Sequence, residues 1–182
     1  MIRLLIICQL SSIIFGQKIF DEFEKGRHNN YHSKETFRFD TVPDDGSYTI
    51  LLESVEGDIK VRAHAGAGAE ITITRKIRAN TEKKAKRLVK DAKILVYHLE
   101  DDQLIQVRSE KKIHYKRNVH TEFELKLPMN INLNLKTAGG DINVTDIRGE
   151  SVLKTSGGDL DLENLMGRIE AHTSGGDIDV SR

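Results

Sequence analysis

An 18-residue unit repeats in tandem toward the end of this chain, and it limits strongly what the chain can fold into. The copies begin at Thr137, Thr155 and Thr173 and read TAGGDINVTDIRGESVLK, TSGGDLDLENLMGRIEAH and TSGGDIDVSR. A short fixed period, with Gly and Asp at constant places and apolar residues alternating after them, is typical of a chain that winds into stacked coils. The repeats therefore predict a mainly all-β protein, a parallel β-solenoid or β-helix with one unit per coil.

Alignment of the copies places apolar residues in columns two positions apart, as expected for strands with one buried face. A second strand per coil is expected at 151–155 and 169–173, where Leu153 and Ala171 would face the core. Each coil would then be flattened, with two faces. The inward columns are Ile142, Leu160 and Ile178; Val144, Leu162 and Val180; and Ile147 and Leu165.

Glycine marks the predicted corners, because a short coil reverses direction within a few residues and Gly adopts positive φ without penalty. The Asp after each pair is expected to accept hydrogen bonds from corner amides and so to act as a cap. The structural corner residues are Gly57 and Asp58; Gly139, Gly140 and Asp141; Gly157, Gly158 and Asp159; and Gly175, Gly176 and Asp177.

The same pattern occurs once near the middle of the chain, in SVEGDIKV at residues 54–61, and is then interrupted. A helix is expected at 80–92, capped by Asn80 or Thr81, and a β-hairpin at 94–108. We therefore predict one elongated solenoid domain over 35–182, with tandem repeats at 137–182 and the helix and hairpin inserted in its N-terminal half.

The N-terminal sequence MIRLLIICQLSSIIFG has an early Arg, a short apolar stretch and a small final residue, so residues 1–16 are predicted to be a cleaved signal peptide. An uncleaved anchor and lipidation at Cys8 are the alternatives. Residues 17–34 are polar and predict a flexible segment, in which His28 and His32 are ordinary linker residues. We expect an exported chain, periplasmic or at the cell surface, without an internal disulfide.

Charge is distributed unevenly although the total is zero. Residues 75–117 carry 14 Lys or Arg against 6 Asp or Glu (14 − 6 = +8), whereas residues 137–182 carry 4 against 9 (4 − 9 = −5). A basic helix face could bind an anionic envelope polymer or lipid headgroups, with peripheral membrane contact. The alternative is a solvated face, paired with the acidic coils of the same chain. The candidate residues are Lys83, Lys84, Lys86, Arg87 and Lys90.

Catalytic signatures are lacking: the sequence has no HExxH, GxSxG, CxxC or P-loop spacing. The paired carboxylates Asp159 and Asp161 recur as Asp177 and Asp179 in the next unit, which favours a structural role over a glycosidase site, since an active site would occur once. Calcium binding between the stacked carboxylates is a second alternative to a purely structural role. We expect no enzyme activity, no cofactor, no metal and no nucleic acid partner.

The order of motifs, from VPDDGS and LLESVEGDIKV to FELKLPMNINLNLKTAGGDINV and the repeated SGGD units, resembles the DUF4097 family of β-strand-repeat proteins, often assigned as adhesins. The resemblance covers roughly residues 35–182. It implies a bacterial surface or envelope location and a non-catalytic role. The repeat array stops in mid-coil at Arg182, unlike the longer arrays of that family, so we expect a fragment or an open end that meets a partner.

These observations favour an exported, adhesin-like binding or scaffold module. Its partners would be an envelope polymer, a surface protein, or another copy at the open solenoid end. An envelope-stress or lipid-sensing protein that acts through the basic helix at 81–92 is the main alternative. A carbohydrate-active enzyme on a β-helix is the second.

Overall fold

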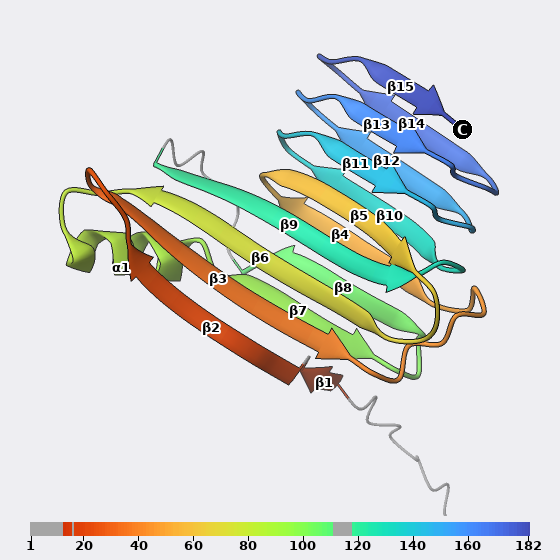
Figure 1. Cartoon of the computed structure of the whole chain (residues 1–182), viewed down its shortest axis with the longest axis horizontal. Coiled ribbons are helices and arrows are strands. Elements are labelled where there is room, and N and C mark those ends of the chain that lie inside the picture. Colours follow the sequence, from red (N-terminus) through yellow and green to blue (C-terminus); the bar gives the residue numbers. More distant parts are fainter. Residues whose placement is uncertain (1–12, 16, 111–117) are drawn as a thin grey trace, which may run out of the picture.

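Two open sheets and one helix make up the computed structural model, which describes residues 13–15, 17–110 and 118–182 (Figure 1). The first sheet contains, in spatial order, β1 (Ile13–Phe15), β7 (Ile94–Leu99), β8 (Leu104–Ser109), β4 (Thr49–Val55), β10 (Asn132–Thr137), β12 (Ser151–Thr155) and β14 (Ile169–Thr173). The second contains β15 (Ile178–Ser181), β13 (Leu160–Glu163), β11 (Ile142–Thr145), β5 (Asp58–His64), β9 (Val119–Pro128), β6 (Ala69–Arg78), β3 (Asn30–Phe39) and β2 (Gln17–Lys25).

The inner faces of the two sheets share one apolar core. Ile50 and Leu52 contribute from β4, and Ile59, Phe123 and Leu125 contribute from β5 and β9, all fully buried. Each such side chain stabilises the fold by about 1.5–3 kcal/mol through burial. The mainly β fold predicted from the alternating residues is therefore confirmed, as two sheets packed face to face.

The tandem units form parallel rungs on both sheets. In the second sheet Ile142 lies opposite Leu160, which lies opposite Ile178. Equivalent residues of successive units therefore pair with one another. In the first sheet β10, β12 and β14 pair in the same way. The predicted columns and the two strands per unit are confirmed.

The isolated motif at residues 54–61 forms the rung beneath the tandem units. Ile59 lies opposite Ile142 and Val61 lies opposite Val144, in parallel pairing, and β4 pairs with β10 on the other sheet. The pattern is thus interrupted in sequence but continuous in space. We call residues 49–64 and 132–182 the coil stack.

We call residues 17–39, 69–110 and 118–128 the base. It contains the predicted hairpin of β7 and β8, and the predicted helix, α1 (Glu82–Asp91). The strands of the base pair mostly antiparallel: β2 with β3, β3 with β6, and β6 with β9. This half therefore departs from the single solenoid predicted for residues 35–182.

The flexible segment predicted for residues 17–34 is also wrong within the described residues, because β2 and β3 form a hairpin there. His28 and Asn29 take positive φ in its turn, and Gly26 N donates to Asn30 O at 2.8 Å. Tyr31 and Ser33 are buried, since they continue the inward alternation of β3. The polar Ser33 concealed that alternation in the sequence.

The predicted signal peptide lies mostly outside the described residues. Of residues 1–16, the structure describes Ile13–Phe15, which pairs with β7 as β1. Cleavage after Gly16 stays a prediction.

Candidate functional site

Helix α1 is held against the base by a few apolar residues. Thr81 caps it, with its side-chain oxygen accepting from Lys84 N at 3.2 Å. Ala85 is fully buried and packs with Tyr31 and Ile77 of the neighbouring strands. Leu88 and Val89 are half-buried against the same cluster, so this side of the helix meets the sheet and the opposite side faces solvent.

The predicted anion-binding residues all lie on the solvent side of α1, and we call them the basic face. All are exposed: Lys83, Lys84, Lys86, Arg87 and Lys90. Lys86 Nζ pairs with Glu82 at 2.6 Å and lies 5.4 Å from the centre of the Phe23 ring. Among the ion pairs between described residues, this is the one that involves the basic face. The structure therefore brings the five residues together, and four of them have no carboxylate partner among the residues that it describes.

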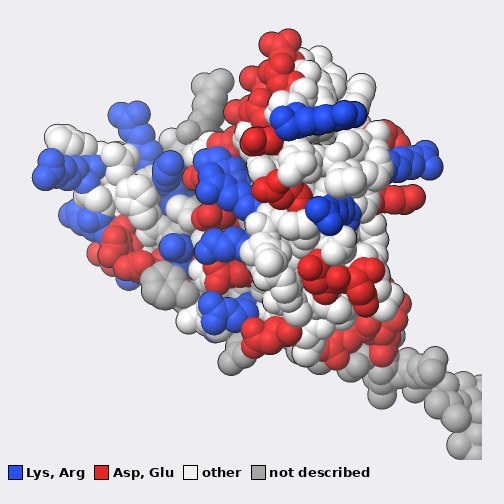
Figure 2. Space-filling view, turned by 45° about the vertical axis from the view of Figure 1, so that its right-hand side comes forward, with Lys and Arg blue, Asp and Glu red and all other residues white. Residues whose placement is uncertain are grey.

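The acidic coils do not neutralise the basic face. Helix α1 lies at one end of the molecule, and β14 and β15 lie at the other (Figure 1). Lys and Arg side chains predominate over the base, whereas a row of Asp and Glu side chains runs up the coil stack (Figure 2). The pairing of helix and coils that the sequence left open is not found among the described residues.

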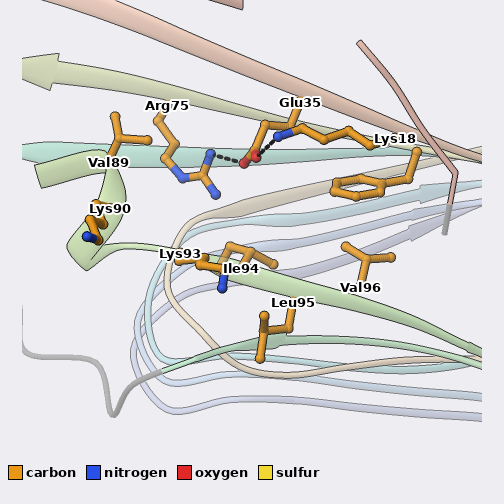
Figure 3. A pocket seen from close by; sticks show the side chains of 10 residues that line it. Lys18, Glu35, Arg75, Val89, Lys90, Lys93, Ile94, Leu95 and Val96 are labelled. Carbon is orange, nitrogen blue, oxygen red and sulfur yellow. Dashed lines mark hydrogen bonds and ion pairs between the residues drawn. The ribbon is translucent and has the colours of Figure 1, made fainter. Parts of the chain in front are cut away.

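A pocket of about 440 Å³ lies beneath the C-terminal end of α1, between the two sheets (Figure 3). The second sheet supplies residues from β2, β3 and β6, and the first sheet supplies the start of β7. Its walls are mainly apolar, with basic side chains among them. The lining residues are Lys18, Glu35, Phe37, Arg75, Val89, Lys90, Lys93, Ile94, Leu95 and Val96.

Arg75 is fully buried in this pocket, although β6 is otherwise apolar on that side. Its side chain lies on the same face of the strand as those of Ile73 and Ile77, which points inward. Its Nη1 donates to Glu35 Oε2 at 2.6 Å, and its Nε donates to Ala92 O at 3.2 Å. Its Nη2 is buried without a hydrogen-bond partner. One donor group of a buried cation is thus left open.

Glu35 links Arg75 to the edge of the sheet. Lys18 Nζ donates to Glu35 Oε1 at 2.6 Å, so both carboxylate oxygens are engaged. Burial raises the pKa of Glu35, but the charge of Arg75 and the hydrogen bonds from Lys18 and Arg75 outweigh it and hold the pKa below its usual value. Glu35 is therefore ionised at neutral pH and is occupied as a partner of Arg75.

The corner aspartates form a ladder along the coil stack. Asp141 N donates to Asp58 Oδ1 at 3.1 Å, and the amides of Asp159 and Asp177 donate at 2.9 Å to the aspartate one unit earlier. The predicted capping role is seen for Asp58, Asp141 and Asp159, with the amide coming from the next coil, whereas Asp177 takes part through its amide. Of the paired carboxylates Asp159 and Asp161, Asp159 thus acts as a structural acceptor.

The corner glycines differ within each pair. A Cβ on Gly158 would lie 2.1 Å from Gly140 O, and one on Gly176 would lie 2.2 Å from Gly158 O. A Cβ on Gly139 or Gly157 would meet nothing within 4 Å. Positive φ, the reason we gave from the sequence, applies to Gly140 but not to Gly158 or Gly176. The second glycine is required because neighbouring coils approach closely there.

Two further sets of residues were missed from the sequence. The unit-initial threonines bind the previous coil: Thr155 Oγ1 donates to Gly140 O at 2.9 Å, and Thr173 Oγ1 donates to Gly158 O at 2.8 Å. Their constant place before each glycine pair was the available signal. Arg75 was missed too, although an Arg in phase with three isoleucines of an alternating strand marks an unusual buried charge.

The described ranges contain neither a cluster of metal ligands nor a membrane-spanning helix. No group of three or more His, Cys, Asp or Glu side chains there is arranged to hold a metal ion. Helix α1 is ten residues long and polar, and no helix of the described chain could cross a membrane.

Comparison with known proteins gives one distant structural match. No family model and no curated protein matches the chain. A solved structure described as a putative cell adhesion protein from Clostridium sporogenes is similar, with a TM-score of 0.45 and 8% identity, over 81% of this chain and 99% of that one. The resemblance to the DUF4097 family stays a prediction from the sequence.

Proposed function

We propose that this chain is an exported, non-catalytic binding protein of the adhesin-like kind, in which the coil stack is a β-solenoid scaffold and the base binds anionic lipid of the cell envelope. The observation that carries the proposal is the basic face of α1. Four exposed cations there have no carboxylate partner in the described chain, and a pocket with a buried arginine opens beneath them.

Electrostatics supports an anionic lipid surface as the partner. Each Lys or Arg near such a surface contributes about 1 kcal/mol to binding. Lys83, Lys84 and Arg87 lie within one helical turn of one another, so one flat surface can meet them together. The acidic coil stack lies at the far end, where it would be repelled from the same surface.

A scaffold role for the coil stack is supported by the hydrogen bonds and close contacts that join each coil to the next. The Asp ladder, the hydrogen bonds from the unit-initial threonines and the close glycine contacts repeat from unit to unit. A catalytic centre needs groups placed once and free to react. The parallel register of the units supports the solenoid description.

Vesicle co-sedimentation tests the proposal. We expect binding to mixed phosphatidylglycerol–phosphatidylcholine vesicles, weak binding to pure phosphatidylcholine, and loss of binding near ~0.5 M salt through screening. The triple variant Lys83→Glu, Lys84→Glu, Arg87→Glu should bind at least about 100-fold more weakly. The matched control carries the same charge change on the coil stack, at Lys136, Arg148 and Arg168, and should bind nearly as wild type. Equal loss in both variants would contradict a site on α1.

Self-association through the last coil is a second candidate. The apolar columns continue into this coil, where Ile178 is 43% and Val180 is 67% exposed. Strands β14 and β15 lie at the edges of both sheets, where another strand can pair. Sedimentation velocity of wild type and Val180→Lys tests it: a concentration-dependent oligomer that the substitution abolishes is expected, and a monomer at all concentrations would exclude it.

A further inference from the structure

We infer that the pocket beneath α1 binds one single-chain anionic amphiphile, with its carboxylate on Arg75 and its alkyl chain between the sheets. The inference rests on the proposed function for the class of partner, and it adds a defined site and a headgroup contact. This site lies between the two sheets and shares one residue, Lys90, with the exposed basic face.

The headgroup contact follows from the hydrogen bonds of Arg75. Nε and Nη1 are taken by Ala92 O and Glu35, and both oxygens of Glu35 are already engaged. Nη2 is left as a buried donor on a charged group, which is costly unless it is paired. Figure 3 shows the guanidinium beside the pocket, with one terminal nitrogen directed to Glu35 and the other turned into the open space. A carboxylate oxygen would satisfy that donor.

The walls fit an alkyl chain. Phe37, Ile94 and Val96 line the pocket from the two sheets, and Val89 lines it from the end of α1. A cavity of about 440 Å³ falls within the usual range for small-ligand sites, about 300–1,000 Å³. A mainly apolar pocket with an unpaired buried donor on Arg75 suits a ligand with one polar end.

The surrounding charges favour an anion. Lys18, Lys90 and Lys93 border the pocket with Arg75, against one lining carboxylate, Glu35. Lys18 and Lys93 are paired with acidic side chains, whereas Lys90 has no such partner among the described residues. An anionic headgroup would therefore meet a positive entrance.

Calorimetric titration of the purified protein with dodecanoate, below its micelle concentration, tests the site. We expect one dodecanoate per chain, with 1-dodecanol binding at least about tenfold more weakly, the effect of one charge-assisted hydrogen bond. Ile94→Trp, which places a bulky side chain in the pocket, should abolish binding of both ligands. The control Val152→Trp, a half-buried position on β12, should bind as wild type, and circular dichroism establishes that each variant is folded.

Three outcomes would overturn the inference: no dodecanoate binding by folded wild-type protein, equal affinity for dodecanol, or unchanged binding by folded Ile94→Trp. The α1 triple variant separates this site from the proposed function. It leaves out Lys90 and should keep dodecanoate binding while losing vesicle binding. If it keeps both, the vesicle surface is misassigned but the pocket stands.

Discussion

The coil stack and the base share the same two sheets, yet they are held together in different ways. In the coil stack the same contacts recur from unit to unit, as in the Asp ladder and the close contact of Gly158 with Gly140. In the base the decisive contacts occur once and include buried charge, as at Arg75 and Glu35. Contacts that repeat in every unit are suited to a scaffold, whereas a single buried cation is suited to binding a ligand.

The largest effect is expected where coils touch. Gly158→Ala places a methyl group 2.1 Å from Gly140 O and should lower the free energy of unfolding by about 3 kcal/mol through overpacking. Gly157→Ala is the matched control, since its Cβ meets nothing within 4 Å, and should change stability by less than about 1 kcal/mol. Chemical denaturation measures both. Equal losses would show that corner conformation, and not coil contact, requires the glycine pair.

Glu35→Gln tests how much the buried ion pair contributes to the stability of the base. The variant should lose about 2 kcal/mol at neutral pH, because Arg75 keeps its buried charge without a carboxylate. Glu35 has a folded-state pKa below the ordinary 4.5, so its contribution is present above pH 4.5 and is lost as pH falls through the lowered value. Denaturation across acid pH should show a smaller decline in the variant than in wild type, because the contribution of Glu35 is lost while those of other carboxylates with lowered pKa values, such as Glu70 and Glu122, remain. Glu163→Gln, exposed on the coil stack, should keep the wild-type decline.

Substitutions at Asp159 test the contribution of one hydrogen bond of the Asp ladder. Asp159→Ala removes the acceptor for Asp177 N and should cost about 1 kcal/mol, whereas Asp159→Asn keeps an acceptor oxygen and should cost less. Asp161→Ala, exposed on the next strand, is the control. Thermal unfolding of the three variants checks the order. A loss at Asp161 as large as at Asp159 would contradict a ladder-specific role.

The smallest effect is expected at His98, which is buried in the base beside Tyr48, with Nε2 and the phenol oxygen 3.2 Å apart. Burial lowers its pKa from 6.5, although Glu100 raises it. Because the unfolded chain takes up this proton more readily, stability should fall as pH drops below 6.5 toward the folded pKa. His98→Gln should flatten that part of the profile by less than about 1 kcal/mol. A profile unchanged by the substitution would assign the slope to other groups.

The sequence was sufficient for the coil stack because its strands pair with copies of themselves. Once Ile142 and Leu160 occupy the same column, the register of a whole rung follows, and residues 57–61 join it by the same pattern. The Asp caps and helix α1 were equally readable, since each depends on neighbours close in sequence or on the repeat.

The base could not be predicted in the same way, because its pairings join unlike segments. β6 lies between β3 and β9, and no repeat signals that order. The polar Ser33 broke the alternation that would have shown β3 in full. Glu35 reaches Arg75 only through that pairing, so the buried ion pair and the pocket follow from tertiary structure.

Amide hydrogen exchange with and without dodecanoate is the most direct test of a scaffold stack joined to a ligand-binding base. Ligand binding slows exchange where it stabilises structure. We predict slower exchange in β6, α1 and β7, around the pocket, and unchanged exchange in β11–β15. Slower exchange confined to the coil stack would contradict the assignment of binding to the base.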